Sequence, residues 1–464
     1  MADIALTHAT VVTMNPRREI IQDGAVAIEG NKIIDVGKTA DIKSRHRIDI
    51  ELDCTHKLVL PGLIDCHVHL AQALIRGCAD DMALIPWLCA RVWPLQGAYT
   101  AEEGKISAQL CCLEMIKSGT TTFVESGLHS RYGLDGIARV VESAGIRAAL
   151  SKKLMNITGY ADRPDAMPKS MVETGEATMR ETLKMIQRWH GKANNRIHIW
   201  FGARTPGACT VDFYREIAER AREHDTGITI HLAEVKQDID YMRGEFGMTP
   251  VQFMEHCGLI GKHVIYAHGV WLPKEDFVKL HETGGTVCHC PSSNLKLASG
   301  IAPVPNMLKA RVNVALGCDG GPSNNSYDMI REMKLTAVIH KGHLRDPEIL
   351  PAETILEMAT LNGARATLWG EQLGSLESGK LADIIVIDQR KPHLVPVRNP
   401  ISNLVYAACG SDVDTVIIDG KIIMEGRKVK TIDEHEIISR AQELGLEVDK
   451  RLGLSIGPFW PVVR

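Results

Sequence analysis

The sequence predicts an α/β protein: a (β/α)8 barrel of the TIM type with a small discontinuous β-sandwich domain built from both termini. Three observations predict this fold class. From about Leu58 to Trp369, short β-branched runs alternate with longer helix-like stretches. Eight such units in series favour a parallel sheet with right-handed crossovers, which closes into a barrel. Both ends of the chain are instead rich in short strands and tight turns.

The two β-rich ends carry the same hairpin signal. Gly30-Asn31 and Asp419-Gly420 each separate two β-rich runs, and such dipeptides favour two-residue hairpin turns. We therefore expect residues 1–58 and 373–464 to form one small domain with a C-terminal helical tail, and residues 59–372 to form the barrel. The strands expected in the small domain are Ala5–Met14, Ala25–Ile28, Lys32–Val36, Ala382–Ile387, Thr415–Ile418 and Lys421–Met424.

The barrel strands are predicted from short β-branched runs that precede helix-like segments. In such a barrel the functional side chains project from the carboxyl ends of the strands. The strands are expected at Gly62–Val68, Thr120–Val124, Arg147–Ser151, Ile197–Phe201, Gly227–His231, His263–Ala267, Gly285–His289 and Val312–Gly317.

Composition and charge exclude several classes of protein. Of the 464 residues, 45% are hydrophobic and 24% charged, which argues against a disordered, collagen-like or coiled-coil chain. The net charge of −4 gives no sign of a nucleic-acid or anionic-membrane partner. No apolar run approaches the roughly 18 residues that cross a bilayer, and no signal-peptide pattern is present. We therefore expect a cytoplasmic protein whose scattered cysteines are buried thiols.

Three strand ends offer side chains that suit a metal ion. His67 and His69 end the first strand, two residues apart and therefore on one face. His231 ends the fifth strand, and Asp319 follows the eighth. An unpartnered imidazole inside a barrel is costly, whereas three nitrogens and one carboxylate oxygen suit a divalent ion with an open position for water. We expect one such ion, zinc as first choice, with iron, manganese or cobalt as alternatives.

Glu234 and His268 fit proton chemistry beside this ion. Glu234 lies three residues after His231 and can move a proton between the metal-bound water and a substrate nitrogen; its alternative role is to orient a ligand. His268 ends the sixth strand and can polarise the substrate or hold the attacking hydroxide. Asp319 can ligate and also accept the water's proton, because a bound metal lowers the pKa of water from about 15.7 to near 7.

Taken together, these motifs resemble the amidohydrolase superfamily, in its mononuclear aminohydrolase branch. The resemblance covers essentially the whole chain, including the segment Gly374–Asp383 that leads back into the small domain. It implies a (β/α)8 barrel, one zinc or iron ion, and a homo-oligomer. The residues that it assigns to the ion are His67, His69, His231 and Asp319, and those that it assigns to catalysis are Glu234 and His268.

Two groups within this branch are most similar. The segments Pro291–Leu297, Gly300–Val304 and Asp319–Ser326 resemble the S-adenosylhomocysteine/methylthioadenosine deaminases. The stretch with Trp87 and Gln96, and the His-Leu-Ala-Glu motif followed by Gly-Met-Thr-Pro, also resemble the s-triazine hydrolases.

Three positions depart from the nucleoside deaminases. Those enzymes place a glutamate where Gln96 stands, a histidine where Arg204 stands and an arginine near Lys152. These changes argue against a nucleoside substrate. The Arg204 guanidinium can bind a carbonyl or anionic group of the substrate, or pair with a carboxylate at the barrel rim.

Trp87, His289 and Asn324 complete the candidate substrate contacts. Trp87 suits an apolar wall of the site or simple core packing, and Asn324 is equally suited to cap the helix that follows it. His289 ends the seventh strand. Lys152 and Lys153 raise the alternative of a carbamylated lysine with two metals, against which the glutamate of HxxE argues.

We therefore expect a metal-dependent hydrolase acting on C–N bonds other than peptide bonds. In the leading hypothesis, metal-bound hydroxide attacks an sp² carbon of a small amino-substituted N-heterocycle of the purine, pterin or triazine type. The alternative is cleavage of an acyclic urea, carbamate or thiocarbamate, as in the phenylurea and molinate hydrolases. A metal-free interaction scaffold is a further alternative, although every ligand position is filled. The expected partners are the small-molecule substrate and further copies of the chain.

Overall fold

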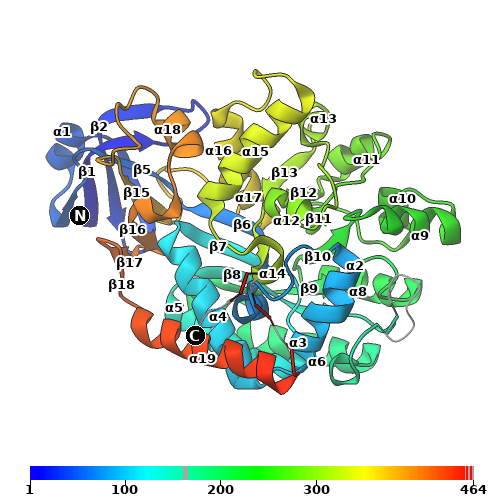
Figure 1. Ribbon diagram of the computed structural model, residues 1–464. Coiled ribbons are helices and arrows are strands. Elements are labelled where there is room, and N and C mark those ends of the chain that lie inside the picture. Colours follow the sequence, from blue (N-terminus) through cyan, green and yellow to red (C-terminus); the bar gives the residue numbers. More distant parts are fainter. Residues whose placement is uncertain (160–165, 455, 458–459, 462–464) are drawn as a thin grey trace.

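A computed structural model describes residues 1–159, 166–454, 456–457 and 460–461 (Figure 1). It contains an all-parallel sheet that curls into a barrel and a separate mixed sheet formed by both ends of the chain. Figure 1 shows the mixed sheet at the left, where blue N-terminal and orange C-terminal strands lie side by side. The predicted α/β class, with a TIM-like barrel and a small extra domain from both termini, is confirmed.

The parallel sheet contains a strand at each of the eight predicted places, and these strands pair in chain order. Because neighbouring strands are parallel, their carboxyl ends lie at one rim of the barrel. The strands are β6 (Leu63–His69), β7 (Thr120–Glu125), β8 (Arg147–Leu154), β9 (Ile197–Ala203), β10 (Ile228–Leu232), β11 (Val264–His268), β12 (Thr286–His289), β13 (Asn313–Leu316) and the short β14 (Asp319–Gly320).

The barrel closes through its eighth strand, which is interrupted. β13 pairs with β12, and after Gly317 and Cys318 the chain continues as β14, which pairs with β6 through Asp319 and Val68. A side chain at Gly317 would place its Cβ 2.8 Å from the Cβ of His67, so only glycine fits at this approach. The interruption turns Asp319 towards the histidines of β6.

Small and aromatic side chains fill the interior of the barrel away from the rim. They form one buried cluster that also includes Trp369, from the segment after the last barrel helix. The cluster includes Ile64, Cys66, Val124, Ala149, Trp200, Ile265, Cys288, Cys290 and Ala315.

The second sheet joins the two ends of the chain. β1 pairs with β4 along its first half and with β5 further on, and β5 pairs with β15 from the C-terminal part. Hydrogen bonds connect all of these strands into one mixed sheet. The domain boundaries at residues 58 and 373 stay a prediction. The strands are β1 (Ala2–Val12), β2 (Ile20–Glu29), β3 (Lys32–Lys38), β4 (Ile48–Asp53), β5 (Lys57–Pro61), β15 (Ile384–Asp388), β16 (Val413–Ile418), β17 (Lys421–Glu425) and β18 (Lys428–Val429).

Both predicted hairpins are present, and their turns meet. The Asn31 amide donates a hydrogen bond to Asp419 at 3.0 Å, and a Cβ on Gly420 would lie 1.9 Å from the Gly30 carbonyl oxygen. A buried bidentate ion pair then ties this sheet to the barrel, because Arg147 of β8 donates to Asp383 at 2.9 and 3.0 Å.

Helices surround the barrel, and the C-terminal helix packs against one of them. In Figure 1, α19 (Glu434–Arg451, red) lies beneath α4 (Ala101–Lys117). Ile437 and Leu444 of α19 pack against Ile106 of α4, and Arg451 pairs with Glu103 at 2.6 Å. Within the described residues, we find no helix with the length and apolar character needed to cross a bilayer.

The longer helices are α4 (Ala101–Lys117), α5 (Leu134–Ala144), α6 (Gly175–Trp189), α8 (Val211–Glu223), α9 (Lys236–Phe246), α11 (Asp276–Thr283), α15 (Met329–Leu344), α16 (Ala352–Ala359) and α19 (Glu434–Arg451). The shorter ones are α1 (Thr39–Arg45), α2 (Leu84–Trp87), α3 (Trp93–Gly97), α7 (Lys192–Asn195), α10 (Pro250–His256), α12 (Pro291–Lys296), α13 (Val304–Lys309), α14 (Gly321–Asn324), α17 (Leu361–Ala366) and α18 (Pro400–Tyr406).

Candidate active site

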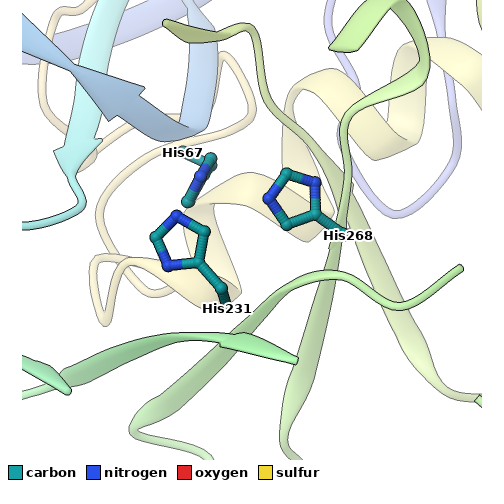
Figure 2. A group of neighbouring side chains, drawn as sticks. All are labelled: His67, His231 and His268. Carbon is teal, nitrogen blue, oxygen red and sulfur yellow. The ribbon is translucent and has the colours of Figure 1, made fainter. Parts of the chain in front are cut away.

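Histidines from three different strands converge at the carboxyl end of the barrel. Figure 2 shows the rings of His67, His231 and His268 around a common space, each from a different strand. The ring centre of His67 lies 4.7 Å from that of His231 and 5.1 Å from that of His268. His69 belongs to the same group, with its Nε2 atom 3.2 Å from Nε2 of His231.

Asp319 brings a carboxylate to the same place. Its Oδ1 atom lies 3.5 Å from Nε2 of His67 and 3.4 Å from Nε2 of His69. Its other oxygen accepts hydrogen bonds from the hydroxyls of Ser293, at 2.6 Å, and Ser323, at 2.9 Å. One carboxylate oxygen is therefore held by serines while the other faces the imidazoles.

The Nδ1 atoms of His67 and His231 are hydrogen-bonded to oxygen atoms of the protein. Nδ1 of His67 is hydrogen-bonded to the Ser126 hydroxyl at 2.5 Å, and Nδ1 of His231 donates to the Arg204 carbonyl oxygen at 2.8 Å. Such partners fix the orientation of a ring and leave its Nε2 free to act as a ligand. Nε2 of His67 is buried and has no hydrogen-bond partner among the described residues.

Burial sets the charge state of this group. It lowers the pKa of His69 to about 3 and holds the pKa of His231 well below its usual range, so these imidazoles are neutral at pH 7. Burial alone would raise the pKa of Asp319, but the nearby His67 ring and the other neighbouring imidazoles outweigh it and hold that pKa low. Neutral imidazole nitrogens beside one carboxylate form a suitable set of ligands for a divalent metal ion.

Glu234 and His268 lie together beside the ligand group. Glu234 follows β10, and its Oε2 atom is 3.6 Å from Nε2 of His268. Nδ1 of His268 donates to the Asn294 side-chain oxygen at 2.9 Å, which directs the ring's other nitrogen inward. Burial raises the pKa of Glu234 to about 7, which poises this carboxyl for proton transfer at neutral pH.

The backbone at this rim adopts an unusual conformation. Ala233, His268 and Asp319 have φ angles of +54°, +75° and +67°, in the left-handed region that non-glycine residues rarely occupy. Each such residue costs on the order of 1 kcal/mol and persists where surrounding contacts fix it. Strain at three strand ends that share one cluster is typical of a functional site.

This barrel matches a family model described as the amidohydrolase family over residues 58–423. The chain belongs to the amidohydrolase family. The sequence-based family assignment is thereby confirmed.

Named relatives in this family are deaminases. The chain is 39% identical to a 5'-deoxyadenosine deaminase of Methanosarcina mazei, over 97% of this chain and all of the relative. It is 38% identical to a 5-methylthioadenosine/S-adenosylhomocysteine deaminase of Pelotomaculum thermopropionicum, with the same coverage. A solved structure of an adenosine deaminase from Xanthomonas campestris with bound zinc has a TM-score of 0.90 and 28% identity, covering 97% of this chain and 99% of the other. The predicted enzyme class, a hydrolase acting on C–N bonds, is confirmed.

Trp87, Gln96 and Arg204 lie on the loops and helices of this amidohydrolase's rim. Trp87 is buried in α2, and its indole donates to the carbonyl oxygen of Pro322 in α14, at 3.3 Å. Gln96 is buried in α3 and forms no hydrogen bond with the strand-end histidines, Glu234 or Asp319. Arg204 follows β9, and no carboxylate in the described part of the chain pairs with its guanidinium.

His289 and Asn324 are placed differently from the other predicted substrate contacts. His289 ends β12, but its ring lies 5.3 Å from that of His340 on α15, in the helix layer. The Asn324 amide donates to the Cys318 carbonyl oxygen at 2.8 Å and to Glu332 at 2.9 Å. Asn324 therefore braces the turn after β14. Its role and that of His289 in substrate binding stay predictions.

Lys152 and Lys153 of this amidohydrolase differ in their surroundings. Lys152 donates to the Glu173 carboxylate at 2.7 Å. Lys153 lies opposite Gly202 in the pairing of β8 with β9, is 4% exposed, and its ammonium group has no hydrogen-bond partner among the described residues. Burial and the charge of Lys152 lower the pKa of Lys153 to about 7.

The sequence analysis missed several residues that hold the site together. Ser126, Ser293, Ser323 and Asn294 fix the predicted ligands and His268 through the hydrogen bonds given above. Glu125 ends β7 and accepts a hydrogen bond from the Leu70 backbone at 2.6 Å, directly after His69. Position directly after or near a strand end would have pointed to Ser126 and Glu125.

Proposed function

We propose that this chain is an aminohydrolase that removes an exocyclic amino group from a small N-heterocycle by hydrolysis. The observation that carries the proposal is the convergence of three strand-end imidazoles and Asp319 on one space, with the Glu234–His268 pair beside it. The named deaminase relatives support this reaction over cleavage of an acyclic urea or carbamate. The filled ligand positions argue against a metal-free scaffold.

We infer that His67, His69, His231 and Asp319 hold one divalent ion, with zinc as the first choice. The buried, unpartnered nitrogen of His67 and the neutral imidazoles support this assignment. The zinc in the adenosine deaminase structure supports it as well. A divalent ion bound there supplies Lewis-acid activation of water at neutral pH.

The remaining steps fall to side chains of this chain. Glu234 moves a proton to the ring nitrogen next to the carbon under attack, because its carboxyl, with a pKa near 7, can both give and take a proton at neutral pH. His268, fixed by Asn294, presents Nε2 to the oxygen that develops charge in the transition state. Asp319 takes the proton that the attacking water loses, and its serine partners keep it in position.

Substrate selection is assigned to Trp87, Gln96 and Arg204. The guanidinium of Arg204, which has no carboxylate partner among the described residues, follows the strand before the one that carries His231. After burial, its charge contributes to the low pKa of that histidine. It can bind a carbonyl or anionic group of a purine, pterin or triazine ring. Gln96 supplies an amide that can both donate and accept, and Trp87 a flat apolar wall.

We also propose that the enzyme works in the cytoplasm as a homo-oligomer. All twelve cysteines are free thiols, most of them buried, as expected in a reducing compartment. The oligomer is proposed from the family resemblance, and light scattering on the purified protein tests it.

A substrate panel tests the proposed reaction. Metal-loaded protein is incubated with 5'-deoxyadenosine, methylthioadenosine, free aminopurines, aminopterins, amino-s-triazines, aryl ureas and thiocarbamates, while ammonia and amines are quantified. We expect ammonia from at least one heterocycle and none from the Glu234→Gln variant. Amine release from a urea without ammonia from any heterocycle would establish the alternative reaction instead. Purified protein that neither retains nor responds to metal would point to the scaffold.

A further inference from the structure

A large cavity lies at the opposite end of the barrel from the candidate active site. Its volume is about 880 Å³, and its lining includes His198, His263, Thr286 and Asn313. These residues stand at or just before the amino ends of β9, β11, β12 and β13, whereas the proposed catalytic groups stand at the carboxyl ends. We call this space the basal cavity. Its size is within the range of small-molecule sites, roughly 300–1,000 Å³.

The basal cavity is lined by more cations than carboxylates. Four cationic side chains line it, whereas Asp225 and Glu371 are its carboxylates. In the described part of the chain, none of the four cations forms an ion pair. Uncompensated cations around one cavity attract anions. The cations are Arg222, Lys262, Arg311 and Arg365.

Two further lining groups lack partners inside the protein. Trp200 is fully buried, and its indole nitrogen, which can only donate, has no hydrogen-bond acceptor among the described residues. Nε2 of His263 is likewise buried without a partner. Buried polar groups normally find partners, so the indole N–H points to an acceptor that the described residues do not supply, and Nε2 of His263 can donate to or accept from the same group.

We propose that the basal cavity binds a small phosphate-bearing molecule, up to about the size of a mononucleotide. The cations and the unpartnered indole N–H favour an acceptor-rich, anionic ligand. Phosphate matches the planar guanidinium groups of Arg222, Arg311 and Arg365 through paired hydrogen bonds, as arginine commonly does. His198 is stacked between Trp369, at 4.3 Å, and His190, at 4.8 Å, so both of its faces are covered and its ring is held in place in the cavity wall. The site is independent of the proposed deaminase reaction.

The alternative explanation is that the cations only stabilise helix ends. Helix C-termini favour nearby positive charge, and Arg222 lies in the last turn of α8. The same turn contains Arg220, which pairs with Glu223 at 2.7 Å and does not line the cavity. Arg220→Gln is therefore a matched control for Arg222→Gln, because both remove one arginine from the same helix end.

Calorimetric titration of the metal-loaded enzyme with inorganic phosphate tests the proposal, with citrate and sodium chloride at equal ionic strength as further arms. We expect saturable binding of phosphate and a loss of affinity of about tenfold in Arg222→Gln and Arg311→Gln, with Arg220→Gln within about twofold of wild type. Tighter binding of citrate than of phosphate would overturn the phosphate assignment. Equal effects of Arg220→Gln and Arg222→Gln, or no saturable binding, would overturn the site.

A second measurement avoids substitutions altogether. Lys262 and Lys421 are both exposed, but only Lys262 lines the basal cavity. Limited acetylation of the wild-type enzyme, followed by mass spectrometry of its peptides, should show phosphate protecting Lys262 at least about threefold more than Lys421. Equal protection of the two lysines would contradict binding in the basal cavity.

Discussion

The two ends of the barrel hold unpaired polar groups of opposite kinds. At the carboxyl end, the groups that converge on the predicted ion site are neutral imidazole nitrogens and carboxylate oxygens, such as Nε2 of His67 and Oδ1 of Asp319, and the cations Arg204 and Lys153 lie outside this group. At the amino end they are donors, among them the Trp200 indole and the Arg222 guanidinium. The same parallel strands thus present acceptors for a cation at one rim and donors for an anion at the other. The length of the strands sets the distance between the two ends, and the side chains at each end determine which kind of ion can bind there.

The largest expected effect is a loss of turnover caused by a substitution at the carboxyl end of the barrel. Glu234→Gln removes the proposed proton carrier but none of the ion's ligands, so turnover should fall by about 10³-fold or more with one metal ion per chain retained. Steady-state assays measure the fall in turnover, and metal analysis measures the retained ion. The matched control is Asp225→Asn in the basal cavity, which should leave turnover within about twofold. Full activity of Glu234→Gln would exclude this residue as the proton carrier.

The second prediction concerns pH and the metal-free protein. Burial raises the pKa of Glu234 from 4.5 to about 7, so the native state holds a proton that the unfolded state has lost in this interval. This group therefore costs stability as pH rises from 4.5 to 7, up to about 3 kcal/mol once both states have ionised. Glu234→Gln cannot ionise, so it should be the more stable form at pH 8, with the difference vanishing below pH 4.5.

Urea unfolding in the presence of a chelator, at pH 4.5 and pH 8, measures this difference. Asp225→Asn again serves as the control, since its carboxylate lies at the other end of the barrel. A stability difference for Glu234→Gln that is the same at both pH values would show that the carboxyl titrates normally.

A smaller effect is expected at the rim of the carboxyl end. Arg204→Met removes a guanidinium without a carboxylate partner in the described part of the chain, so KM should rise about tenfold while kcat changes little. Steady-state kinetics with the substrate from the panel measures both constants. Arg188→Met on the exposed face of α6 is the control. Unchanged KM with lowered stability would instead assign Arg204 a structural role.

The smallest effect is expected at His289, whose side chain points away from the barrel interior although it stands at the end of a strand. His289→Asn should change KM by less than about twofold and mainly lower stability, by about 1 kcal/mol, because the ring lies beside His340 rather than in the barrel interior. Kinetics and thermal unfolding together measure this. A rise in KM as large as that of Arg204→Met would place His289 in the substrate site, as its position at a strand end predicts.

The positions of the strands and of the candidate ligands could be predicted because they depend on local patterns. β-branched runs located the barrel strands, and the spacing of His67 and His69 put both side chains on one face. The break in the eighth strand could not be read in this way. It follows from the close approach of Gly317 to His67, which are 250 residues apart in the chain.

The sequence by itself determined the barrel, the β-rich ends and the set of strand-end residues that suit a metal ion, because hydrophobic period and residue type are local properties. Only the tertiary structure decided which neighbours face inward: Cys288 lies in the barrel interior and His289 outside it, and one residue of register exchanges them. It also brought Ser126 and the Arg204 carbonyl to the imidazoles and gathered four cations at the opposite end. Such contacts join residues from separate elements, and only closure of the barrel brings them within reach.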